Sequence, residues 1–83
     1  MTLNQWKREF SMRVAMCMKT QGIDSQRELS KRCGISETSI SRYLAGERVP
    51  KITSIINLAD ALRVSPSYLI DFGETIDIKG MKL

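Results

Sequence analysis

Four polar residues near the middle of the 83-residue chain carry side chains that suit recognition of a hydrogen-bonding surface. Their spacing of one, three and one positions places them on one face of a helix. Arginine pairs with guanine through two hydrogen bonds, glutamate accepts from the amino group of cytosine, and a threonine methyl contacts the methyl of thymine. The spacing therefore predicts a face that can hydrogen-bond to base edges. The four residues are Glu37, Thr38, Ser41 and Arg42.

The sequence offers few residues suited to metal binding or acid–base catalysis. It contains no histidine, and its two cysteines, Cys17 and Cys33, are not in a CxxC arrangement. This excludes the usual zinc sites and histidine-based acid–base chemistry. Both cysteines fall among apolar positions, so we interpret them as small buried hydrophobes. We expect no catalytic residue, no metal ion, no cofactor and no small-molecule ligand.

Two short helices joined by a glycine turn must position the polar face. Ser25 and Glu28 have capping-box spacing, which predicts a helix over about 25–33, and Gly34 supplies the left-handed residue that ends it. Ser36 is the expected N-cap of the next helix, over about 36–45. Such a pair is a helix-turn-helix.

Three further helices are expected around this pair. Amphipathic spacing predicts helices over about 3–21 and 53–63, and Ser65 before a proline predicts a short one over about 66–71. We expect Tyr68 and Leu69 to pack inward. The fourth helix should be well covered, because its apolar face is broad. That face consists of Ile52, Ile55, Ile56, Leu58, Ala59 and Leu62.

The expected fold class is all-α, a compact five-helix domain over residues 1–72 with a C-terminal tail over 73–83. The isoleucines of the tail alternate with polar residues, so it could form a short β-strand or a frayed end. No apolar run approaches the ~20 residues of a membrane span, and the polar start is unlike a signal peptide. We therefore expect a cytoplasmic protein.

The net charge of +4 is unevenly spread. Residues 1–70 contain eleven basic and six acidic residues, whereas residues 71–83 contain two and three. A basic body suits a polyanion, although ordinary solubility explains such a charge equally well. The aromatic residues Trp6, Phe10 and Tyr43 fall on inward positions, which argues against single-strand binding through stacked bases.

The sequence resembles the phage-repressor helix-turn-helix family, whose members are Cro-like or lambda-repressor-like. The resemblance runs from about Phe10 to Leu69 and is strongest over PKITSIINLADALRVSPSYL. The residues that carry it are Gln26, Leu29, Gly34, Ile35, Ser36, Ile40, Ser41, Gly46, Pro50, Ile52, Leu58, Ala59, Leu62, Val64 and Leu69.

The resemblance implies roles for individual residues. Those at the base-reading positions of the recognition helix are Glu37, Thr38 and Arg42, with Ser41 secondary. Residues at the ends of helices or in the following loop stand where the family contacts DNA phosphates. These are Ser25, Gln26, Ser36, Ala45, Arg48 and Lys51. Each could also be an ordinary surface residue.

Two positions depart from the family pattern. Many members hold an Arg–Glu pair between the first helix and the end of the third, and here Met18 and Leu44 stand at those positions. We expect these two side chains to contact each other. Ser30 replaces the usual alanine, and its hydroxyl is expected to bond to the backbone carbonyl one turn earlier.

The resemblance implies a sequence-specific transcriptional regulator, repressor-like and of phage or prophage type. One short helix reads only a few base pairs, so we expect a homodimer on a pseudo-palindromic operator of double-stranded DNA. The alternative is an antitoxin-like or adaptor protein whose tail binds a protein partner.

Overall fold

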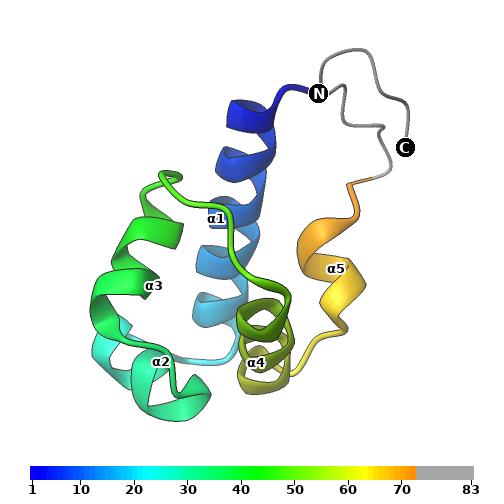
Figure 1. Ribbon diagram of the computed structural model, residues 1–83. Helices are drawn as coiled ribbons and strands as arrows, with labels where there is room; N and C mark the ends of the chain where they lie inside the picture. The colour runs from blue at the N-terminus through cyan, green and yellow to red at the C-terminus, as the bar shows by residue number, and fades with distance from the viewer. Residues whose placement is uncertain (73–83) are drawn as a thin grey trace.

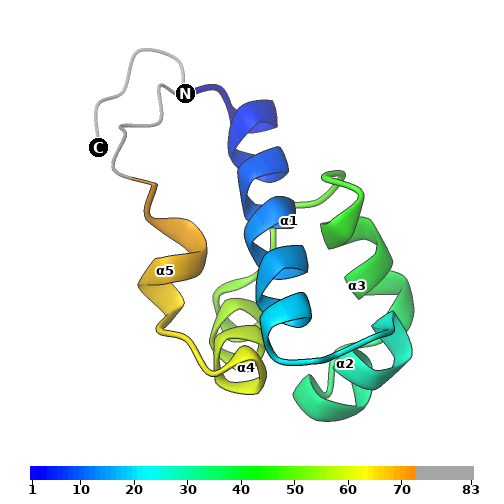
Figure 2. The ribbon, with the colours of Figure 1, turned by 180° about the vertical axis from the view of Figure 1, so that it is seen from behind.

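The computed structural model describes residues 1–72, and within them it contains helices and no strand. In Figure 1, α1 stands between α3 on one side and α5 on the other, and Figure 2 shows the same arrangement from behind. The all-α, five-helix class is confirmed. The helices are α1 Leu3–Thr20, α2 Gln26–Cys33, α3 Glu37–Leu44, α4 Ile52–Leu62 and α5 Pro66–Ile70.

Capping side chains fix where the helices begin. Ser25 accepts a hydrogen bond from the Glu28 backbone N–H, as predicted, with 3.1 Å between the atoms. The Glu28 carboxylate instead accepts from the Arg32 guanidinium one turn later, at 3.2 Å, so only half of the predicted capping box forms. A full box occurs at α1, where Thr2 and Gln5 bond reciprocally, and sequence reasoning missed it.

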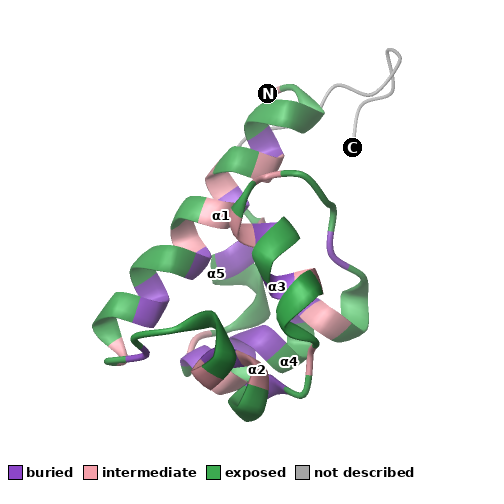
Figure 3. Ribbon diagram, turned by 90° about the vertical axis from the view of Figure 1, so that its left-hand side faces the viewer, coloured by how far each residue is buried: buried purple, intermediate pink, exposed green. Residues whose placement is uncertain are grey.

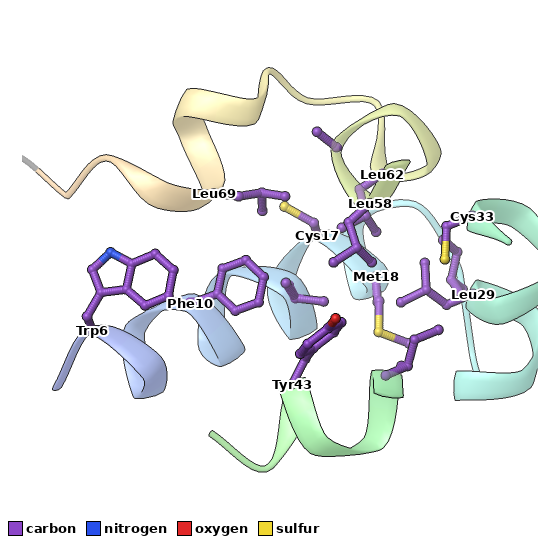
Figure 4. Packing of buried hydrophobic residues seen from close by; sticks show 14 residues of the cluster. Trp6, Phe10, Cys17, Met18, Leu29, Cys33, Tyr43, Leu58, Leu62 and Leu69 are labelled. Atoms are coloured by element: carbon purple, nitrogen blue, oxygen red, sulfur yellow. The ribbon is translucent and has the colours of Figure 1, made fainter. Parts of the chain in front are cut away.

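Side chains from all five helices meet in one core (Figure 4). The Phe10 ring lies at its centre, stacked on Trp6 at 5.4 Å between ring centroids and meeting the Tyr43 ring edge-on at 6.2 Å. The predicted burial of both cysteines is confirmed, and burial raises the pKa of the Cys17 and Cys33 thiols. The largest fully buried side chains are Phe10, Val14, Leu29, Ile40, Leu58, Leu62 and Leu69.

The prediction that the whole apolar face of α4 is buried is wrong at two positions. Ile52 is 65% exposed and Ile56 is 50% exposed. The helix packs on α2 and α5 through the stripe that begins at Ile55, and Ile56 lies about 100° around the axis from it. Ile52 is the first residue of the helix.

Helix α5 is held against α1 by contacts distant in sequence. The Trp6 indole N–H donates to the Ile70 carbonyl at 3.2 Å, and the Arg13 guanidinium donates to the Tyr68 carbonyl at 2.6 Å. The guanidinium also lies 4.9 Å from the centroid of the Tyr68 ring, on the molecular surface. The predicted inward packing of Tyr68 is therefore wrong, whereas that of Leu69 is confirmed.

The predicted tail over 73–83, with its candidate strand, lies outside the described residues. Over residues 1–72, no helix has the length and apolar character needed to cross a bilayer.

Candidate nucleic-acid interface

The turn between α2 and α3 is held to Ser30 of α2 by two hydrogen bonds. Gly34 adopts the left-handed conformation, with φ 73° and ψ 12°, and its N–H donates to the Ser30 carbonyl at 2.9 Å. The Ser30 hydroxyl donates to the carbonyl of Ile35, the next residue of the turn. Our expectation of a bond one turn earlier is therefore wrong. The reversed chain brings a carbonyl that no helix uses against α2, and Ser30 satisfies it.

The start and the inner face of α3 fix its orientation. Ser36 caps the helix, accepting from the Ser39 backbone N–H at 3.2 Å. Ile40 and Tyr43 are buried, and the Tyr43 hydroxyl donates to the hydroxyl of Ser54 on α4 at 3.3 Å. With these residues inward, the opposite face of α3 is exposed, as the green stretches of α3 in Figure 3 show.

The exposed face of α3 lines a shallow hollow, which we call the reading hollow. All four predicted base-reading residues line it, together with Gln26 from the start of α2. One further side chain there, Glu47, was not singled out from the sequence. Its acidic type and loop position gave no signal, because its place depends on how the chain leaves α3. The lining residues are Gln26, Glu37, Thr38, Ser41, Arg42 and Glu47.

The loop after α3 folds back onto that helix. Gly46 is left-handed, with φ 72°, and the Glu47 N–H donates to the Arg42 carbonyl at 3.0 Å. The Arg48 guanidinium donates to the Ser39 hydroxyl at 3.3 Å. The loop is thus attached to α3 at two places, and the second attachment holds the basic side chain of Arg48 against the helix.

The other predicted phosphate-contacting residues do not line the reading hollow and stand at the ends of helices. Ser36 and Ala45 cap the two ends of α3, and Lys51 is the N-cap residue of α4. Ser25 caps α2. All four are exposed, so the structure leaves each of them accessible to a ligand.

A second hollow lies where α1, α2 and α3 meet. Met18 and Leu44 both line it, so the structure brings these two residues to one place, and a direct contact between them stays a prediction. Ser25 and Gln26 share the hollow with Lys19, a cation of the last turn of α1. Sequence reasoning assigned no role to Lys19, because the proximity of α1 to the start of α2 is a tertiary feature.

Comparisons with known proteins agree with this geometry. A family model described as helix-turn-helix matches residues 16–69. The chain is 40% identical over 53 residues to the Type II methyltransferase M.Sau96I of Staphylococcus aureus, a match that covers 64% of this chain and 12% of the methyltransferase. The chain thus spans only a small part of that relative's length.

Two solved structures share the fold. The restriction-modification controller protein C.AhdI from Aeromonas hydrophila has a TM-score of 0.71 at 25% identity, covering 76% of this chain and 94% of that chain. A hypothetical transcription factor from Neisseria, NHTF, has a TM-score of 0.73 at 24% identity, covering 81% of this chain and 77% of that chain. The similarity extends across most of each structure.

Proposed function

Because the chain belongs to the helix-turn-helix family of DNA-binding transcriptional regulators, we propose that it binds specific operator sequences with α3 in the major groove. The observation that carries this proposal is the reading hollow. Four side chains able to hydrogen-bond to base edges line it together on the outer face of α3. The major groove admits an α-helix and presents a distinct pattern of donors and acceptors at each base pair.

Within this proposal, two groups of residues act differently. The base-reading group is Glu37, Thr38, Ser41 and Arg42, and each good bidentate contact gives ~1–3 kcal/mol of discrimination between bases. The phosphate-contacting group positions the domain on the duplex without reading its sequence. That group consists of Ser25, Gln26, Ser36, Ala45, Arg48 and Lys51.

We propose further that the protein binds as a homodimer. An α3 of eight residues reads only a few base pairs, and two half-sites about one helical turn apart, ~34 Å, supply the remaining specificity. Helix α5 and the chain beyond it are the proposed contact. Tyr68 supports this choice, because this large residue of α5 is 44% exposed.

The biological setting has two candidates. The resemblance to Cro-like proteins favours a repressor of a phage or prophage. The similarity to a Type II methyltransferase and to a restriction-modification controller favours a regulator of a restriction-modification system. We favour the second, since the sequence relative and the structural neighbour both support it. Either role places the protein in the bacterial cytoplasm, where its operator lies.

The test is selection of bound duplexes from a random library at a stated salt near physiological. The proposal expects an inverted repeat with half-site centres about one helical turn apart. Enrichment of a single unrepeated half-site would contradict the proposed dimer. It would leave the proposed base-reading role of α3 intact. A pool that shows no enriched sequence would contradict the proposed function and favour the adaptor alternative.

A further inference from the structure

The charge of the reading hollow is opposite to the charge of the chain. Two carboxylates, Glu37 and Glu47, line it with one guanidinium, that of Arg42. The whole chain carries +4. Basic side chains near DNA are favoured by the phosphates, and carboxylates there are repelled unless they meet hydrogen-bond donors. The acidic members of the hollow therefore require a specific partner on the DNA.

Glu37 already has such a partner in the proposed function, but Glu47 does not. Glu47 is exposed and lies beyond the end of α3, where the helix dipole offers a carboxylate no compensation. Its backbone is fixed, because its N–H donates to the Arg42 carbonyl at 3.0 Å directly after the left-handed Gly46. The side chain thus begins from a defined place beside the α3 face.

In the major groove the donors a carboxylate can meet are the exocyclic amino groups of cytosine and adenine. Adenine carries an acceptor, N7, beside its amino group, and that acceptor repels a carboxylate. Cytosine presents only the donor there. Cytosine is therefore the better partner for a carboxylate that enters the groove.

We infer that Glu47 is a further specificity-determining residue, which accepts a hydrogen bond from a cytosine amino group at the edge of each half-site. The inference rests on the proposed function and assigns a fifth residue to the same hollow. It also gives the loop after α3 a part in base reading, beyond the phosphate contact assigned to Arg48.

The test compares two variants that remove the same charge. E47Q replaces the carboxylate by an amide, which pairs with the N6 and N7 atoms of adenine. D60N makes the equivalent change on the exposed surface of α4, outside the reading hollow. The wild type and both variants are passed through the duplex selection at one salt concentration, and folding is checked by circular dichroism.

For E47Q we expect the preference for cytosine at one position of each half-site to fall about tenfold, with adenine gaining there. D60N should select the wild-type sequence. If E47Q and D60N select the same sequence, Glu47 reads no base and the inference is overturned. If the wild type itself enriches no sequence, the proposed function fails first, and the inference fails with it.

Discussion

The Arg48 guanidinium donates a hydrogen bond to the Ser39 hydroxyl, with 3.3 Å between Nη1 and Oγ. Ser39 lies on α3 beside the reading face, and Arg48 lies in the loop that follows the helix. This bond holds a proposed phosphate contact in place before DNA arrives, so less side-chain freedom is lost on binding.

Removing the hydrogen bond between Arg48 and Ser39 should weaken DNA binding without changing the base preference. We expect S39A to lower affinity for all duplexes two- to fivefold, because Arg48 must then be ordered by the DNA, a cost of about 0.5–1 kcal/mol. The base preference should stay that of the wild type. Titration of the selected operator and of an unrelated duplex measures both. S11A, a serine change on α1, is the control, and an S39A affinity equal to that of S11A would disprove the role.

The two classes of proposed DNA contact predict different mutant behaviour. R42A should relax the base preference at one position of each half-site, because the guanidinium is the proposed reader of guanine. K51A should weaken binding to all sequences about equally and reduce the slope of log K against log salt by roughly one. Binding isotherms on matched and mismatched duplexes over a salt series separate the two. Identical behaviour of the two variants would refute the division into readers and phosphate contacts.

The hydrogen bond that attaches α5 to α1 predicts a measurable contribution to the stability of the fold. W6F keeps an aromatic ring in the core but removes the indole N–H that donates to the Ile70 carbonyl. We expect a loss of about 1 kcal/mol in the free energy of unfolding, measured by denaturant titration. W6A also leaves a cavity and should cost about 3–5 kcal/mol. Equal losses for the two variants would show that the hydrogen bond contributes and the ring does not.

The two buried thiols predict how stability depends on pH. Burial raises the pKa of Cys17 and Cys33 above the ordinary value of 9.0, so the folded state favours the protonated thiols. Their contribution is fully present below pH 9.0 and is lost as the pH rises through the folded pKa. Denaturant titrations at pH 7 and above pH 9 should show this loss in the wild type. The loss of stability between the two pH values should be smaller in a C17A/C33A variant. An equal loss in that variant would show that other titrating groups cause it.

Local patterns predicted much of the fold. Ser25 and Ser36 are capping types at the spacing that helix starts require, and Gly34 is the residue that a left-handed turn favours. These signals act within a few residues of each other, so they can be read without tertiary information. The helix-turn-helix, which positions the candidate site, was predicted for this reason.

The remaining features depend on contacts between distant segments. Ile56 resembles a core residue in sequence, and only the position of its neighbours leaves it exposed. Glu47 reaches the reading hollow because the loop folds back through Gly46 and Arg48. The sequence indicated that Ser30 needs a partner, but the identity of that partner depended on where the turn places the Ile35 carbonyl.

The most direct test of the central claim, that α3 reads the major groove, is methylation interference on the selected operator. Methylation of guanine N7 blocks the major-groove edge that Arg42 is proposed to contact. We predict interference at one guanine in each half-site with the wild type, and loss of that interference with R42A. Interference confined to minor-groove methylation of adenine N3, or a guanine signal that R42A leaves unchanged, would contradict the account.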